Sequence, residues 1–173
     1  MKLGEEHPDL DDIDRQILAV MQENCRLPLA KIGEHVGLSA PSVMERVKKL
    51  EDGGVITGYR AVLNARLLGK DITVFIGVST GHPPTIDHFE REIEPLDDIL
   101  ECHHVTGSHT FIIKAKTRNT SSLETLISRI RAIEGVVRTE TMVVLSTHIE
   151  RIQVPVIEEP PVTKRGRRAT ERA

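Results

Sequence analysis

The sequence predicts an α+β protein with a helical N-terminal part and a second part in which strands and helices follow the order β-α-β-β-α-β. Two observations support this division. Before residue 55, apolar residues recur at helical spacing between glycine and proline breaks. After residue 70, runs rich in β-branched residues alternate with two amphipathic helical patterns. The two parts are therefore expected to bury separate cores.

Two short helices joined by a tight turn are predicted from Leu27 to Gly53. Pro28 suits the first turn of a helix, Gly37 suits the turn, and Ser39 is a good N-cap with Pro41 just inside the next helix. That second helix has a buried stripe at positions i, i+4 and i+7, formed by Val43, Val47 and Leu50. This spacing is typical of a helix-turn-helix, whose second helix enters the major groove of DNA.

A preceding helix from Leu10 to Asn24 completes a predicted winged-type helix-turn-helix of three helices. Asp11 or Asp12 caps it, and Asp14 and Arg15 are expected to face water. Its apolar face contains Ile13, Ile17, Leu18 and Met21. After the helices, the stretch from Val55 to Leu63 alternates as an exposed strand does.

The second part is predicted to have the ferredoxin-like order of strands and helices. A hairpin turns at Gly107-Ser108, Ser121 or Ser122 caps the last helix, and Gly135 ends it. One sheet face remains uncovered, and Leu, Ile and Val on it would favour pairing with a second copy. The expected strands cover 71–80, 99–106, 109–116 and 136–149, and the first helix runs from Pro83-Pro84 to Ile93.

The predicted domains are a helix-turn-helix domain with linker strand (1–63), a linker (64–70), a regulatory domain (71–153) and a disordered basic tail (154–173). The tail is rich in proline and then charged. Its basic cluster can be a solubilising feature or a loose contact to DNA phosphate. The cluster contains Lys164, Arg165, Arg167 and Arg168.

Composition narrows the function classes. With one Tyr, three Phe and no Trp in 173 residues, the chain lacks an aromatic platform for single-stranded nucleic acid. Residues 1–63 hold 8 basic against 11 acidic residues, so DNA affinity is expected to need two paired units. Cys25 and Cys102 are expected to be free thiols, and no signal peptide or membrane span is evident, which predicts a cytoplasmic protein without membrane contact.

Six residues at the second helix are candidate contacts to double-stranded DNA. Arg46 is the main candidate for guanine or phosphate, Lys49 for the backbone, and Glu45 either accepts from a cytosine amino group or pairs with a lysine. The full set is Ser39, Ser42, Glu45, Arg46, Lys48 and Lys49. For Arg46 and Lys48, the alternative is a solvated charge on the surface without a role in DNA binding.

Residues 10 to about 152 resemble the Lrp/AsnC (leucine-responsive, feast/famine) transcription regulators. The similar segments are LDDIDRQIL, HVGLS with VMERVKKLEDGGVITGYRAVLN, CHHVTGSHTFIIKAK, and SLETLISRIRAIEGVVRTETMVVLS. The resemblance implies sheet-paired dimers that assemble into tetramers or octamers. It also implies a linker strand that pairs near the twofold axis, and small amino acids bound between dimers at the hairpin turn.

The resemblance implies an effector site at Gly107, Ser108, His109 and Thr110, completed by Thr139 and Thr141 on the last strand. Relatives carry a Gly-Asp/Asn-Tyr-Asp type of turn, so the carboxylate and the aromatic ring are both missing here. A carboxylate would pair with the ammonium group of an amino acid. His109 would make binding sensitive to pH near neutrality. No cofactor is expected beyond this possible effector.

Cys102, His103, His104 and His109 raise the alternative of a metal site. Cys102 and His104 would share one strand face and His103 the other, which is not the paired spacing of a closed zinc site. No metal is therefore expected.

The leading interpretation is a sequence-specific, salt-sensitive DNA-binding regulator of a partly palindromic promoter, modulated by a small amino acid or related metabolite. An architectural DNA-binding protein without an effector is the alternative, favoured by the altered hairpin. A decarboxylase of the haem pathway with the same fold is a weaker alternative, because no matching active-site motif is present. The chain is thus expected not to be an enzyme.

Overall fold

The computed structural model describes residues 8–81 and 86–156. Within them the chain forms two compact units, one of residues up to 61 together with those from 151, the other of residues 62–150. We call these the helix-turn-helix unit and the regulatory unit. No helix in the described ranges is both long and apolar enough to cross a membrane.

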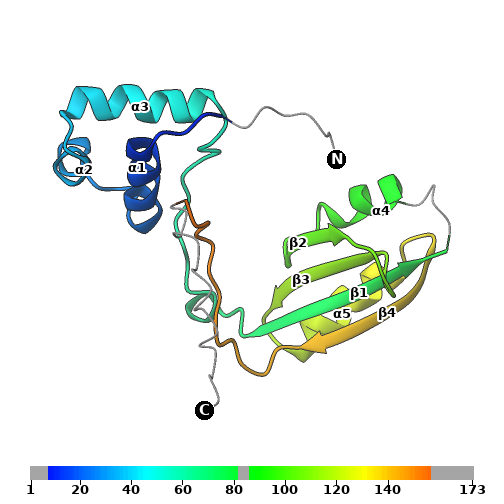
Figure 1. The fold of residues 1–173 in the computed structure, drawn as a ribbon. Coiled ribbons are helices and arrows are strands. Elements are labelled where there is room, and N and C mark those ends of the chain that lie inside the picture. Colours follow the sequence, from blue (N-terminus) through cyan, green and yellow to red (C-terminus); the bar gives the residue numbers. More distant parts are fainter. Residues whose placement is uncertain (1–7, 82–85, 157–173) are drawn as a thin grey trace, which may run out of the picture. The chain divides into compact units, whose positions relative to one another are not determined.

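The helix-turn-helix unit contains α1 (Asp12–Glu23), α2 (Leu29–Val36) and α3 (Ala40–Asp52), so the prediction of three helices is confirmed (Figure 1). Asp11 caps α1 and Ser39 caps α3 through side-chain oxygens that accept from backbone N–H groups. Gly37 ends α2 in the left-handed conformation, at φ 73°, which a side chain would disfavour.

The core of this unit is aliphatic. Its fully or nearly fully buried members include Ile17, Ile32 and Val43, one from each helix. The turn between α2 and α3 also passes close to α2, because a Cβ atom on Gly33 would lie 2.3 Å from the carbonyl oxygen of Leu38. The glycine is therefore needed for close approach of the two backbones.

Asp14 does not face water, which corrects the prediction. It is only 3% exposed, and its backbone N–H donates to Asp11 Oδ1 over 2.8 Å in a capping box. Arg46 from α3 supplies the opposite charge. Sequence periodicity could not reveal this, because the partner is 32 residues away.

The stretch from Val55 to Leu63 is not a strand in the structure. It has no ladder partner in the described residues, and a strand cannot form without one. A single 3-10 turn, η1 (Arg66–Leu68), follows and ends at Gly69. Four apolar side chains of this connection are strongly exposed: Val62 78%, Leu63 68%, Leu67 84% and Leu68 62%.

The regulatory unit has a four-stranded antiparallel sheet in the order β2-β3-β1-β4, with α4 and α5 on one face, which confirms the ferredoxin-like arrangement (Figure 1). The element bounds are β1 (Ile72–Thr80), α4 (Ile86–Ile93), β2 (Ile99–His104), β3 (Phe111–Thr117), α5 (Thr120–Arg131) and β4 (Val136–Val143). Pro83 and Pro84, predicted to open α4, lie outside the described residues.

The first residues of the predicted disordered tail are bound to α1. Gln22 Nε2 donates to the Val154 carbonyl over 2.9 Å, and Gln22 Oε1 accepts from the Val154 N–H over 2.7 Å. Residues 157–173, with the predicted basic cluster, lie outside the described residues.

Several predicted boundaries are wrong. β2 ends at His104 rather than at residue 106, and β3 begins at Phe111 rather than at residue 109. β4 ends at Val143 rather than at residue 149, because its partner β1 begins at Ile72 and pairs Val74 with Val143. Asn119 rather than Ser121 or Ser122 caps α5: its side chain accepts from the Ser122 N–H over 2.9 Å, and the Ser122 hydroxyl returns to the Asn119 N–H. Ser122 is thus the second member of a capping box.

The two faces of the sheet differ in chemistry. The face under the helices is a closed apolar core, in which Phe89 of α4 stacks on Phe111 of β3 with ring centroids 4.6 Å apart. On the open face the register places Phe75, Ile112 and Met142 among charged side chains. The expectation of a Leu-, Ile- and Val-rich open face is therefore wrong.

Candidate nucleic-acid interface and effector site

The candidate DNA-binding residues of α3 differ in accessibility. Ser39, Glu45, Lys48 and Lys49 are exposed, whereas Ser42 and Arg46 are partly buried. The opposite stripe of the helix, Val43, Val47 and Leu50, is buried in the core as predicted. The exposed side chains are therefore available to a partner without unpacking the unit.

The Arg46 side chain is bound by two aspartates of the same unit. Its Nη1 atom donates to Asp11 Oδ2 and to Asp14 Oδ1, each over 2.7 Å. Its Nε and Nη2 atoms make none of the hydrogen bonds found in the described residues. A backbone bond from Asp14 and the Arg46 guanidinium lower the pKa of Asp11, while both carboxylates raise the pKa of Arg46. Arg46 thus joins α3 to α1.

Ser39 and Ser42 are also engaged locally. The Ser39 hydroxyl accepts from the Ser42 N–H over 3.4 Å, and the two hydroxyl oxygens lie 2.9 Å apart. Both side chains therefore stabilise the start of α3, and Ser39 retains an exposed position there.

One exposed residue of α3 was missed in the sequence analysis. Met44 is 57% exposed, and an apolar side chain on a groove-facing helix can contact the methyl group of thymine. Helical periodicity could have predicted this exposure, because at 3.6 residues per turn residue 44 lies outside the buried stripe of Val43, Val47 and Leu50.

At the hairpin between β2 and β3, His109 lies flat against the open face of the sheet. A Cβ atom on Gly77 would come within 2.7 Å of the imidazole, so only glycine leaves room for this ring. The His109 Nδ1 atom is 3.5 Å from Ser79 Oγ, and Nε2 is 3.8 Å from a Glu140 carboxylate oxygen. The side chain is only 15% exposed.

The other hairpin candidates make separate contacts. Gly107 has a φ of 125° at the turn. The Ser108 carbonyl accepts from the Ser79 hydroxyl over 3.2 Å. The Thr110 hydroxyl accepts from the Thr80 N–H over 3.1 Å and lies 3.2 Å from the Thr80 hydroxyl. The hydroxyl of Thr110 is thus used to hold the hairpin on β1.

Thr139 and Thr141 lie on the opposite side of the sheet from His109. They pair with Val78 and Ile76, whose side chains are in the core under the helices. Thr139 Oγ1 accepts from Arg131 Nε of α5 over 2.7 Å. Within one chain, the structure therefore does not bring these threonines together with the hairpin residues.

Two surface pockets of the described residues do not coincide with the predicted effector residues. A pocket of about 780 Å³ lies between α4 and β2, and another of about 390 Å³ is lined by Lys70, Asp98 and Arg129 among others. None of the six predicted effector residues lines either.

Cys102, His103 and His104 of β2 point to the sheet faces that were predicted for them. By pairing, Cys102 and His104 share the helix side with Ile113 and Phe111, and His103 is on the open side. Burial and the charge of Glu90 raise the pKa of the Cys102 thiol to about 11. Over the described ranges, no group of three or more His, Cys, Asp or Glu side chains is placed to hold a metal ion.

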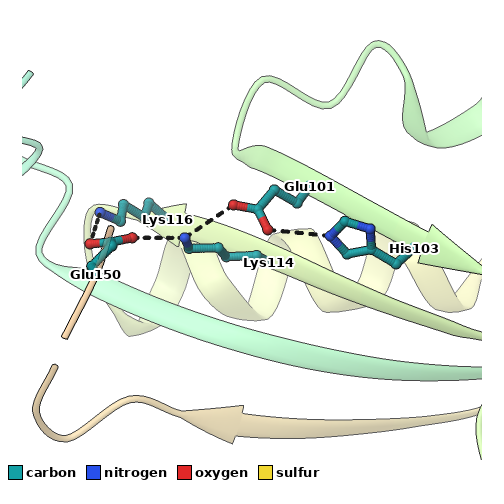
Figure 2. Close-up of polar contacts among 5 residues, drawn as sticks. All are labelled: Glu101, His103, Lys114, Lys116 and Glu150. Carbon is teal, nitrogen blue, oxygen red and sulfur yellow. Dashed lines mark hydrogen bonds and ion pairs between the residues drawn. The ribbon is translucent and has the colours of Figure 1, made fainter. Parts of the chain in front are cut away.

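The open sheet face carries a connected charge cluster, which we call the Lys114 cluster (Figure 2). Lys114 Nζ donates to Glu101 over 3.1 Å and to Glu150 over 2.7 Å. These bonds lower the pKa values of Glu101 and Glu150, and the bond to Glu150 raises the pKa of Lys114. His103 contacts Oε2 of Glu101, and Lys116 contacts Oε2 of Glu150. Two lysines thus compensate two carboxylates on this face.

Sequence families account for both units. The AsnC-type helix-turn-helix domain matches residues 10–51, and the Lrp/AsnC ligand binding domain matches residues 73–154. The first match covers the three helices except the last residue of α3, and the second covers the sheet from the second residue of β1, with the hairpin and the Lys114 cluster.

Named relatives and solved structures agree with these matches. The chain is 33% identical over 147 residues to the HTH-type transcriptional regulator FL11 of Pyrococcus furiosus, covering 85% of this chain and 97% of that protein. It is 34% identical over 140 residues to the leucine-responsive regulatory protein of Escherichia coli, covering 79% and 85%.

A transcriptional regulator of Neisseria meningitidis, solved in complex with L-Met, superposes with a TM-score of 0.83 at 26% identity, over 86% of this chain and 97% of that one. The Pyrococcus and Neisseria proteins are transcriptional regulators, and the Escherichia coli protein is a regulatory protein. With both of its units matched, this chain belongs to the Lrp/AsnC family of transcriptional regulators.

Proposed function

We propose that this regulator binds double-stranded DNA sequence-specifically through the exposed side of α3. The supporting observation is that Glu45, Lys48 and Lys49 are solvent-exposed on a helix whose opposite stripe is fully packed. Arg46 contributes through Nε and Nη2 while Nη1 stays on the two aspartates. Ser39 and Ser42, at the start of α3, contact phosphate or base edges.

Selection of duplexes from a random library tests this proposal directly. The enriched duplex and a scrambled duplex of equal composition are compared by fluorescence anisotropy. We expect a preference of at least about 10³-fold, the lower range for specific DNA-binding proteins. Lys48→Gln and Lys49→Gln should weaken binding, whereas Arg129→Gln on the exposed side of α5 is a charge-matched control. Equal affinity for the two duplexes would contradict specific recognition.

We further propose that the active form is a homodimer or a larger even assembly. Phe75 and Met142 are 36% and 46% exposed on the open sheet face, beside Ile112. The apolar connection of Val62, Leu63, Leu67 and Leu68 is a second surface suited to a partner copy. Two copies would place two α3 helices about one DNA turn apart, at half-sites of a partly palindromic promoter.

Light scattering after size-exclusion chromatography measures the mass of the assembly, and variants at each surface show which one holds the copies together. Met142→Asp should shift the mass towards the monomer, because a charge without a partner is costly in an apolar interface. Leu67→Asp tests the connection independently, and Glu92→Asp on exposed α4 is a control of similar chemistry. A wild-type mass corresponding to a monomer at micromolar concentration would contradict the assembly.

The effector is proposed to be a small amino acid or related metabolite bound near the hairpin of residues 107–110. The L-Met complex of the Neisseria regulator supports this class of ligand. Because Thr139 and Thr141 lie on the other sheet face, the site requires hairpins from neighbouring copies. Calorimetry against the twenty amino acids, followed by His109→Ala for any ligand that binds, tests this assignment.

An architectural role without an effector is the second candidate. It is favoured by the engagement of Thr110 with Thr80 and of His109 with Gly77, which leaves few free polar groups at the hairpin. No heat of binding across the whole amino-acid panel, together with DNA bending by the wild-type protein, would favour this candidate.

A further inference from the structure

The smaller of the two pockets, of about 390 Å³, lies at the end of the sheet away from the hairpin of residues 107–110. Ile72 of β1 pairs with Thr117 of β3, so β1 begins where β3 ends, and the pocket is lined by chain segments that meet there. We call it the Arg118 pocket, after the residue that follows β3. Its volume is within the range of small-molecule sites, about 300–1,000 Å³.

The floor of the Arg118 pocket is part of the core of the regulatory unit. Leu96 and Leu126 line the pocket, are each only 4% exposed, and pack among the buried side chains between the sheet and its helices. The backbone beside them is also fixed, because the Asp98 carbonyl accepts from the Lys116 N–H over 2.9 Å. The pocket is therefore a feature of the packed fold and exists without any rearrangement.

The rim of the pocket is charged and has an excess of cations. Lys70, Arg118 and Arg129 line it, against Asp97 and Asp98. Lys70 Nζ donates to the Asp98 carboxylate, so these two charges compensate each other. The guanidinium groups of Arg118 and Arg129 are exposed and take part in no hydrogen bond or ion pair within the described residues. Two unpaired arginines thus face the single carboxylate of Asp97.

The two hydroxyl groups of the pocket are already used inside α5. The Ser122 hydroxyl donates to the Asn119 carbonyl over 2.9 Å, and the Thr125 hydroxyl donates to the Ser121 carbonyl over 3.0 Å. The two guanidinium groups are therefore the free donors of the site, with five N–H groups each and no acceptor. Guanidinium groups pair with carboxylate and phosphate oxygens through two parallel hydrogen bonds. The pocket is thus suited to an anion.

The spacing along α5 indicates the shape of that anion. Ser122, Thr125 and Arg129 lie on one side of the helix because they are three and four residues apart. At about 1.5 Å per residue, Arg129 is about 10 Å along the helix from Ser122. The Ser122 hydroxyl accepts from the Arg118 N–H over 3.1 Å, so Arg118 is at the Ser122 end. An elongated ligand with a negative group at each end fits this arrangement better than a single small ion.

We propose that the Arg118 pocket binds a small organic dianion, with one negative group at Arg118 and the other at Arg129. The carbon skeleton of the ligand packs on Leu96 and Leu126. This site is separate from the effector site proposed at the hairpin, and it does not depend on the proposed DNA binding. Asp97 limits the affinity, because its charge repels the ligand.

Isothermal titration calorimetry of the full chain in phosphate-free buffer tests the site. The probes are succinate and adipate, which carry a carboxylate at each end, and phosphoglycolate, which carries a phosphate at one end. Butyrate is the control, since it has the carbon chain of succinate with one carboxylate, and inorganic phosphate is a dianion without a skeleton. We expect at least one dianion to bind with a Kd below about 1 mM. Butyrate and inorganic phosphate should bind about tenfold more weakly or less, because each loses a contact to one arginine.

Variants assign the binding to the two arginines. Arg118→Gln and Arg129→Gln should each weaken the dianion about tenfold, since each removes a charged hydrogen-bond donor. Arg66→Gln, exposed and outside the pocket, is the matched control. Asp97→Asn should tighten binding, because it removes the repelling charge and keeps the side-chain shape. DNA binding is compared without these anions, so Arg129→Gln remains a control for contacts made by α3.

Several results would overturn the proposal. They are no binding of any of the three dianions, equal affinity for succinate and butyrate, unchanged affinity in both arginine variants, and weaker binding to Asp97→Asn. Inorganic phosphate that binds as tightly as the organic dianions would indicate an adventitious ion only. Amide shifts in NMR spectra locate the ligand: they should change at Asp98 and Arg118 and not at residues 107–110. Changes at the hairpin alone would assign the anion to the other site.

Discussion

The two units use charged side chains in opposite ways. In the helix-turn-helix unit, Arg46 bonds to Asp14, whose side chain is 4% exposed, and this pair connects two helices of the core. In the regulatory unit, Lys114 bonds to Glu101 and Glu150, whose side chains are 44% and 47% exposed on an open sheet face. The difference lies in the carboxylates: Asp14 is enclosed by its own fold, whereas Glu101 and Glu150 remain accessible, although Lys114 itself is less exposed than Arg46.

This difference separates structural charge from surface charge. A buried carboxylate has lost its water and depends on its partner, so the ion pair cannot be broken cheaply. Exposed carboxylates regain water when a partner is removed, so their pair adds little to stability. The first role of Arg46 is therefore to stabilise the fold. The ion pairs of the Lys114 cluster can rearrange when another molecule covers the sheet.

The largest effect is expected from Arg46→Ala, which leaves Asp14 buried without its cation. The loss of a bond to a charged group and the unpaired carboxylate should destabilise the helix-turn-helix unit by about 2–3 kcal/mol. Amide hydrogen exchange in α1 and α3 measures this locally. Lys49→Ala, exposed on the same helix, is the control and should change protection little.

The Arg46 effect should also depend on pH in a defined direction. The backbone bond from Asp14 and then the Arg46 guanidinium lower the pKa of Asp11 in the folded protein, so the Arg46 part of this stabilisation is present above the ordinary value of 3.8 and disappears as the pH falls through the folded value. The wild type and Arg46→Ala should therefore converge in acid. A protection difference that grows in acid would contradict the ion pair as its cause.

Gly77→Ala tests a packing contact on the open face rather than an ion pair. The added methyl group would come within 2.7 Å of the His109 ring, so the ring or the strand must shift, at a cost of about 1–3 kcal/mol. Thermal unfolding measures the cost. The double variant Gly77→Ala/His109→Ala should recover most of the loss, and equal stability of single and double variants would show that His109 is not the obstacle.

Lys114→Met measures how much the Lys114 cluster contributes to stability, for comparison with the pair of Arg46 and Asp14. Removing this lysine should cost no more than about 1 kcal/mol, because both glutamates are exposed to water. Hydrogen exchange in β2 and β3 measures it, with Lys116→Met as a neighbour whose ammonium group forms a single ion pair within the described residues, at 4.0 Å. A cost equal to that of Arg46→Ala would abolish the distinction between the units.

The smallest perturbation is a spectroscopic titration of Tyr59, the one tyrosine of the chain. Partial burial and a 2.8 Å bond from its hydroxyl to Glu51 raise the pKa of Tyr59 to about 12. Because this pKa is raised, the associated stability is full below pH 10 and is lost as the pH rises through 12. Ultraviolet absorbance reports the midpoint, and Glu51→Gln should lower it. A wild-type midpoint near 10 would contradict the contact.

Local patterns in the sequence determined most of the fold. Apolar spacing identified α1, α2 and α3, since their buried faces repeat every turn. Runs of β-branched residues identified the four strands, and Gly37 and Ser39 marked the turn and cap of the helix-turn-helix. The predicted end of β4 was wrong, because a strand ends where its neighbour ends, and that neighbour is distant in the sequence.

Only the tertiary structure decided the roles of individual polar residues. The sequence marked Arg46 as a free cation and Asp14 as a surface carboxylate, but helix packing made them a pair. It grouped Thr139 with His109, but strand register placed them on opposite faces. It treated Val154 and Val156 as the start of a free tail, but α1 holds them. These contacts join residues that are far apart in the chain, so the spacing of residues in the sequence does not predict them. Helices and strands are predictable because their patterns arise among neighbouring residues.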